Sequence, residues 1–134
     1  MGVRLERSTA SALEIARWLQ TRPEVGAVMC PMLPGSPGHD LWQRDFTGGC
    51  GLFSFTLAQP DPFARAQLID ALNLFGIGFS WGGFESLVIP FDPAQIRAYR
   101  PLVAGAGLRL SIGLEDVGDL IADLEAGFGA MAAG

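Results

Sequence analysis

Residues 107–128 read GLRLSIGLEDVGDLIADLEAGF, and the fold depends on this stretch because its apolar period changes near the middle. The first half alternates between apolar and other side chains, which predicts a half-buried β-strand. Its apolar face consists of Leu108, Leu110 and Ile112, and its other face of Arg109, Ser111 and Gly113. The second half repeats apolar residues at helical spacing, namely Val117, Leu120, Ile121, Leu124 and Phe128. The stretch therefore predicts a strand followed directly by an amphipathic helix.

Two carboxylates mark the start of this helix. Asp116 occupies the position of an N-cap, and Asp119 lies in the first turn, where the helix dipole favours negative charge. The helix is expected to hold the strand against the core, and the strand then presents Arg109. An arginine in the middle of an apolar strand is suited to a bidentate grip on a carboxylate.

The size and composition of the chain limit what it does. Its 134 residues suit one domain with a single core, and we take residues 1–134 as that domain. Hydrophobic residues make up 49% and charged residues 17%, so the chain either buries its apolar residues unusually well or has part of its surface covered by another chain or domain. The net charge of −5 argues against a nucleic-acid-binding role. With no apolar run of about 20 residues and no signal peptide, we expect a cytoplasmic protein without a membrane segment.

The available residues disfavour several kinds of catalytic or metal site. Cys30 and Cys50 lie far apart, and together with the single histidine, His39, they do not supply the roughly four ligands of a zinc site. We expect both cysteines to be reduced thiols. No serine lies on a nucleophile elbow, and the glycines around Cys50 precede a strand instead of joining a strand to a helix. We therefore expect neither a Ser-His-Asp triad nor a phosphate-binding loop.

Turn and cap signals divide the rest of the chain into short elements. The predicted helices cover residues 8–21, 39–45, 61–75, 92–100 and 116–128, and the first is expected to extend back through residues 3–7. The predicted strands cover residues 25–29, 52–57, 77–79, 86–89 and 108–112, with Pro90 ending the fourth, and residues 130–134 are expected to fray. This order predicts an α/β fold, a two-layer α+β sandwich whose mostly antiparallel sheet carries its helices on one side.

Ser80-Trp81-Gly82-Gly83 is the other stretch that suggests a binding site. A tryptophan between a serine and two glycines needs a partner for its indole N–H or a surface for its ring. Together with Arg109, it could grip the α-carboxylate of an amino acid, with Ser80 and Trp81 as single donors. From the residues alone, a solvent-facing arginine and a core tryptophan explain the pattern more simply.

Three stretches resemble a known family. Residues 34–55 read PGSPGHDLWQRDFTGGCGLFSF, residues 79–87 read FSWGGFESL, and the third stretch is residues 108–128. They resemble the Cys/Met-metabolism family of pyridoxal-phosphate (PLP) enzymes, and the first two resemble its cystathionine β-lyase branch. Trp81 is typical of that branch, because the γ-type members usually carry a smaller aliphatic residue there. Phe79 and Ser111 depart from the pattern, since many relatives have tyrosine and some have histidine at these positions.

The resemblance covers nearly all of this chain but only the C-terminal third of such an enzyme. It implies the small C-terminal domain of a fold-type I PLP enzyme, in which Arg109 binds the substrate α-carboxylate with help from Ser80 and Trp81. The branch cleaves cystathionine to homocysteine, pyruvate and ammonia, with PLP held on a lysine. All nine basic residues of this chain are arginine, so it has no such lysine. The resemblance places the lysine in a preceding large domain, and we expect the chain alone to be inactive.

Three interpretations remain open on the sequence. The chain is the C-terminal domain of a β-lyase, whose apolar face docks on the PLP domain and otherwise drives self-association into a homo-oligomer. Alternatively, it is a non-catalytic amino-acid-binding module that kept the carboxylate clamp. The third interpretation is a purely structural dimerisation domain, which would bind no ligand.

Overall fold

The computed structural model describes residues 2–96 and 105–133. In that part of the chain, five strands form one sheet in the order β1-β2-β5-β4-β3. The strands are β1 Val25–Met29, β2 Leu52–Leu57, β3 Gly76–Ile77, β4 Leu87–Phe91 and β5 Gly107–Ser111. All neighbouring pairs are antiparallel except β3 and β4, which are parallel. The opening stretch therefore supplies the central strand, β5, between β2 and β4.

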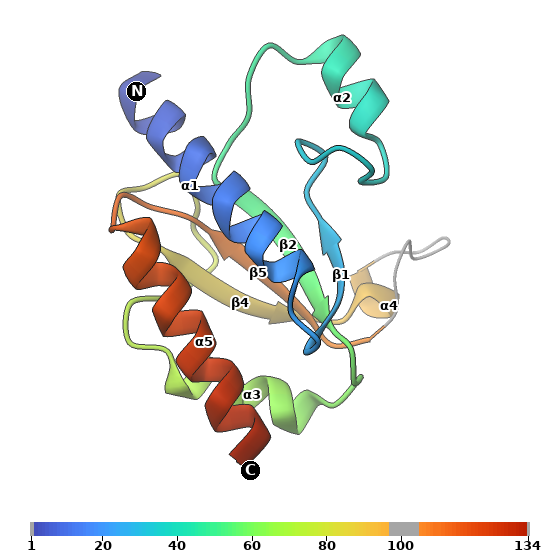
Figure 1. Cartoon of the computed structure of the whole chain (residues 1–134), viewed down its shortest axis with the longest axis vertical. Coiled ribbons are helices and arrows are strands. Elements are labelled where there is room, and N and C mark those ends of the chain that lie inside the picture. The colour runs from blue at the N-terminus through green and yellow to red at the C-terminus, as the bar shows by residue number, and fades with distance from the viewer. Residues whose placement is uncertain (1, 97–104, 134) are drawn as a thin grey trace.

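The helices lie mainly on one side of this sheet (Figure 1). They are α1 Gly2–Gln20, α2 His39–Asp45, α3 Pro62–Ala71, α4 Pro93–Ile96 and α5 Val117–Ala133. Helices α1 and α5 cross the same face, and α3 packs beside α5. The predicted α/β sandwich with a mostly antiparallel sheet is confirmed, as is the backward extension of the first helix.

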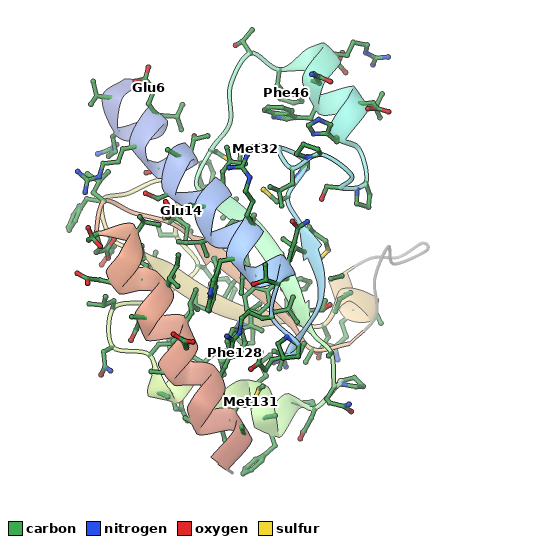
Figure 2. The ribbon with its side chains drawn as sticks, in the orientation of Figure 1. Glu6, Glu14, Met32, Phe46, Phe128 and Met131 are labelled. Carbon is green, nitrogen blue, oxygen red and sulfur yellow. The ribbon has the colours of Figure 1, made fainter. Side chains whose placement is uncertain are left out.

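The core lies between the sheet and these helices. Leu108, Leu110 and Ile112 are buried on the helix-covered face of β5, as their alternation predicts. Phe128 of α5, labelled in Figure 2, packs its ring against that of Phe55 with the ring centroids 6.3 Å apart. The cap at the start of α5 also forms, because Asp119 N–H donates to Oδ1 of Asp116 at 3.1 Å.

The helix α3 ends at Ala71, so its predicted extension to residue 75 is wrong. The reason is a carboxylate from α5: Asp123 accepts hydrogen bonds from the backbone N–H groups of Asn73 and Leu74. These bonds satisfy the backbone N–H groups of the bend that follows α3, and Leu72 already has extended backbone angles. Asp123, which lies 49 residues after Leu74 in sequence, therefore ends α3.

Three other predicted boundaries are also corrected. Strand β4 continues through Pro90, because the two-residue strand β3 pairs only with Leu87 and Val88 and leaves the N–H side of Pro90 without a strand partner. The extended piece expected at 77–79 becomes β3 at Gly76–Ile77. Helix α5 continues to Ala133 instead of fraying from residue 130, and Met131 packs against the core. The predicted helical residues 97–100 lie outside the described part of the chain.

Within residues 2–96 and 105–133, no helix combines the length and apolar character that crossing a membrane requires.

Candidate functional site

The face of the sheet away from the helices carries Arg109. Strand register places Arg109 between Ser54 of β2 and Ile89 of β4, and these three side chains share a face because directly paired residues point the same way. The Arg109 side chain is half-buried, and one terminal nitrogen, Nη2, donates a hydrogen bond to the backbone carbonyl of Phe79 at 2.5 Å. Arg109 thus keeps part of its surface exposed while its guanidinium is tied to the backbone of Phe79.

The segment between β3 and β4 runs over the same face of β5. Three contacts fasten it: the Arg109–Phe79 hydrogen bond, a bond from Gly82 N–H to Oγ of Ser111 at 3.2 Å, and one from Leu114 N–H to the carbonyl of Phe84 at 2.8 Å. We call residues 79–86 the substrate loop, after the expectation from the sequence that its Ser80 and Trp81 help to bind a substrate. Each contact joins the loop to β5 or to the turn that follows β5, so the loop keeps its register along the strand.

The C-terminal end of the substrate loop is the most firmly held part. The Glu115 carboxylate accepts hydrogen bonds from the N–H of Ser86 at 3.0 Å and from its hydroxyl at 2.9 Å. The Ser86 oxygen in turn accepts from Gly113 N–H at 2.9 Å. Gly113 has no room for a side chain, because a Cβ there would lie 2.2 Å from the Phe84 carbonyl oxygen. These contacts explain Glu115 as an anchor for the loop.

Ser80 and Trp81 are exposed on this loop. Trp81 keeps 65% of its surface exposed, so the simpler explanation of a core tryptophan is wrong. Its side chain lines a hollow of about 340 Å³, whose other lining residues include Leu5 of α1 and Cys50. Arg109 lines a separate cavity of about 560 Å³ together with Phe79. The structure thus places Arg109 against the residue next to Ser80, while the indole of Trp81 lies over the neighbouring hollow.

The Arg109 cavity also contains two charged residues that the sequence reasoning did not assign to a site. Arg65 of α3 and Asp92, just after β4, form an ion pair there with 3.0 Å between Nη1 and Oδ1. The same nitrogen of Arg65 lies 2.8 Å from the carbonyl of Phe91 and 3.4 Å from that of Gly107. Asp92 was expected only as the first residue of the predicted helix 92–100. No local pattern marks Arg65, because its contacts are 26 to 42 residues away in sequence.

The two cysteines differ in environment. Cys30 is buried, and this burial raises the pKa of its thiol, whereas Cys50 is exposed beside the Trp81 hollow. Among the described residues, no group of three or more histidine, cysteine or carboxylate side chains is placed to hold a metal ion. The chemistry that this face supports is therefore anion binding, with a guanidinium and exposed donors on the substrate loop.

Comparison with known proteins identifies what this arrangement is similar to. A family model described as Cys/Met metabolism PLP-dependent enzyme matches residues 1–129. Cystathionine beta-lyase MetC of Escherichia coli (strain K12) is 49% identical over 133 residues, which covers 96% of this chain and 34% of the relative. The solved structure of metB from Corynebacterium glutamicum has a TM-score of 0.81 at 34% identity over 96% of this chain and 34% of its own. O-acetylhomoserine sulfhydrylase of Wolinella succinogenes has a TM-score of 0.78 at 31% identity, covering 95% of this chain and 34% of its own.

Proposed function

Because this chain belongs to the Cys/Met metabolism family of PLP-dependent enzymes, we propose that it is the substrate-carboxylate-binding part of a cystathionine β-lyase. Such an enzyme would cleave cystathionine to homocysteine, pyruvate and ammonia. The chain spans 34% of the length of the Escherichia coli relative, so the whole reaction belongs to a longer assembly of which this domain is one part.

One observation carries this proposal: the half-buried Arg109 guanidinium, held on its strand and tied to the substrate loop. A guanidinium has five N–H donors in a planar fork, and the bond to Phe79 uses one terminal nitrogen. The remaining donors are enough to bind both oxygens of a carboxylate. The same bond fixes the start of the substrate loop, where Ser80 directly follows Phe79, whereas Trp81 lines a separate hollow, so assistance from Ser80 and Trp81 is part of the proposal.

The residues of this chain do not fit covalent attachment of PLP. The cofactor chemistry of this family requires a lysine amine for the Schiff base, and all nine basic side chains here are arginine. We therefore assign to this chain recognition of the substrate and no step that runs through the cofactor. It follows that the 134 residues alone, mixed with PLP and cystathionine, release no pyruvate, which a coupled lactate dehydrogenase assay measures.

Amino-acid binding by the chain itself tests the clamp. We expect ¹⁵N-labelled chain to bind L-methionine at millimolar concentration in an NMR titration and to bind L-methioninol, which lacks the carboxylate, much more weakly. Arg109→Leu should abolish the methionine response, and Arg109→Lys should weaken it, because an ammonium cannot form the two-point fork. Arg44→Leu, an exposed arginine of α2, serves as the matched control. Equal binding of methionine by the wild type and Arg109→Leu would contradict the proposal.

The second candidate function is a stand-alone amino-acid-binding module, which would use the same Arg109 guanidinium and its bond to Phe79. The affinity separates the two interpretations. A module that binds its ligand without help should reach submillimolar affinity, whereas part of a shared active site should bind more weakly. In both cases binding depends on Arg109, so the titration above tests the clamp while the dissociation constant distinguishes the roles.

A further inference from the structure

The hollow beside Trp81 contains a nucleophile that the proposed function does not use. We propose that its exposed thiol, Cys50, is a site of reversible modification by small acidic disulfides. The ligand class is the disulfide of a short aliphatic thiol that carries a carboxylate, and the attached thiol would occupy the hollow. This inference does not depend on the carboxylate clamp, because Arg109 lines the other cavity.

The backbone next to Cys50 is fixed against the hollow. The carbonyl of Gly51 accepts a hydrogen bond from the N–H of Ile112 at 2.8 Å. Gly51 has no room for a side chain, because a Cβ there would lie 2.6 Å from the Ile112 oxygen and 3.2 Å from Cβ of Ser8. Residue 51 is therefore packed between α1 and the residue that follows β5. The thiol of Cys50 itself stays exposed, so a disulfide in solution can reach it.

The hollow has room and suitable walls for an aliphatic group attached to Cys50. Its volume is about 340 Å³, and its lining includes the apolar side chains of Leu5, Leu52 and Trp81. A short aliphatic chain on the sulfur would leave water and pack against these walls, including the exposed indole of Trp81. The volume exceeds that of a two-carbon chain, so a terminal charged group also fits.

Two side chains of α1 give the hollow a preference for an acid. Arg4 and Ser8 are four residues apart, so they are neighbours on one face of the helix, and both line the hollow. Ser8 is only 6% exposed, yet its hydroxyl makes no hydrogen bond to another residue of 2–96 or 105–133. Every fully buried polar side-chain atom in these ranges has a partner, so the Ser8 oxygen is open to the hollow.

The charges around the hollow agree with this preference. None of its lining residues is a carboxylate, and no aspartate or glutamate of the described ranges forms an ion pair with Arg4. A guanidinium beside a free hydroxyl donor can hold a carboxylate by charge-assisted hydrogen bonds. The acidic end of a group attached to Cys50 would therefore lie against Arg4 and Ser8.

The modification is an exchange that needs no oxidant besides the disulfide itself. The Cys50 thiolate attacks one sulfur of the disulfide, and a new bond forms between Sγ and that sulfur while the old disulfide bond breaks. The displaced thiolate takes up a proton from water, which balances the proton that Cys50 lost. One thiol and one disulfide thus give one mixed disulfide and one thiol, and an excess of free thiol reverses the reaction.

The experiment uses three disulfides whose arms differ only in the terminal group, each in a buffer that also contains its own thiol. They are 3,3′-dithiodipropionic acid, bis(2-hydroxyethyl) disulfide and cystamine, which end in a carboxylate, a hydroxyl and an ammonium. Intact mass spectrometry of the acid-quenched chain gives the equilibrium constant for each mixed disulfide. We expect the native chain to carry one adduct, and Cys50→Ser should carry none while folded.

Arg4→Gln gives a prediction of opposite signs. Loss of the guanidinium should lower the constant for the carboxylate arm about threefold, leave that for the hydroxyl arm unchanged and raise that for the ammonium arm. Comparison of wild type and variant with the same disulfide cancels the intrinsic stability of each disulfide bond. Arg17→Gln is the matched control, because it removes the same charge from an exposed position about 20 Å farther along α1. At about 0.1 M salt it should change none of the three constants.

Either of two results would overturn the proposal. One is a native chain whose Cys50 forms no mixed disulfide, and the other is a folded Arg4→Gln variant that changes all three constants by the same factor. Circular dichroism establishes that the variant is folded. If it is not, Ser8→Ala decides from the second donor: it should lower the constant for the carboxylate arm about threefold and leave that for the ammonium arm unchanged. Equal effects of Ser8→Ala on both arms would then refute the site.

Discussion

Arg109 shows how one side chain joins two parts of the site. Its Cα belongs to the central strand, and its guanidinium reaches across to the backbone of the substrate loop. An exposed arginine would lose side-chain entropy on binding a carboxylate, whereas this one is already restrained by its bond to Phe79. If Arg109 binds a carboxylate as proposed, the same bond couples that binding to the position of the loop. We therefore expect Arg109→Lys to change both.

Thiol reactivity is the prediction at the scale of single residues. Burial raises the pKa of Cys30, and burial also blocks access to it, while Cys50 is exposed. We expect N-ethylmaleimide at neutral pH to modify the native chain once, at Cys50, and to modify Cys30 only after urea unfolding. Peptide mass spectrometry identifies the site, and Cys50→Ser should remain unmodified while folded. Rapid modification of Cys30 in the native state would show that the core around it is open.

Among the elements, the substrate loop and β5 behave as one unit. Hydrogen bonds from Arg109, Ser111 and the turn after β5 hold the loop along its length, and Glu115 fastens its end. The loop carries exposed aromatic side chains that contribute little to its own stability. Its conformation therefore depends on polar contacts to the strand beneath it.

Gly113→Ala tests this dependence. The new Cβ would lie 2.2 Å from the Phe84 oxygen and 2.6 Å from a backbone carbon of Glu85, so the loop must move. We expect a loss of about 1–3 kcal/mol in the free energy of unfolding, the usual cost of overpacking, together with weaker amino-acid binding. Gly83→Ala is the matched control in the same loop, because no atom lies within 4 Å of its Cβ position. Urea denaturation of both variants measures the change that each substitution makes in the free energy of unfolding.

The turn from α1 to β1 gives a pH-dependent prediction. Partial burial raises the pKa of Glu24, but its hydrogen bond and ion pair with Arg22, 3.0 Å away, outweigh that effect and leave the pKa lowered. A carboxyl whose pKa is lower in the folded state stabilises the fold above its unfolded pKa, and this stabilisation is lost as the pH falls through the folded value. The wild type should therefore exceed Glu24→Gln in stability at pH 7, and the difference should shrink as the pH falls below the unfolded glutamate pKa of about 4.3 and vanish below the lowered folded pKa. Urea unfolding across this pH range measures it, and a constant difference would contradict the assignment.

At the scale of the whole molecule, the open side of the sheet is unusually apolar. Phe79, Trp81 and Phe84 of the substrate loop are 81%, 65% and 70% exposed. The relatives are about three times longer than this chain, as 34% coverage implies, so they contain further residues that could cover such a surface. We propose that the rest of the enzyme docks here.

Self-association of the 134-residue chain tests this surface. We expect the sedimentation coefficient to rise with concentration, because burying exposed aromatic side chains against a second copy is favourable. Phe84→Glu, a change of an exposed side chain outside the clamp, should weaken this association. Phe46→Glu, an exposed aromatic residue that follows α2, is the matched control and should leave the association unchanged. A wild type that stays monomeric at high concentration would contradict the docking surface.

Local patterns in the sequence were enough to establish the elements and the layered architecture. The change of period in residues 107–128 predicted a strand and a capped helix, and both are present. The strands at Val25–Met29 and Leu52–Leu57 have the predicted bounds. These features depend on residues that lie a few positions apart in the sequence, so a short stretch contains their physical cause. The family, too, is evident from motifs in continuous sequence.

Only the tertiary structure decided the features that depend on distant residues. Asp123 ends α3 early, Arg65 reaches the Arg109 cavity from another element, and Trp81 lies over a hollow beside α1. These contacts join residues that are 26 or more positions apart, as Arg65 and Phe91 are, and no periodicity links them. The sequence by itself determined which residues could bind a carboxylate. The packing of α3 and the substrate loop onto the sheet determined which residues face the same cavity. Arg65 and Arg109 share one cavity and Trp81 lines another, because these positions depend on how the elements meet in space.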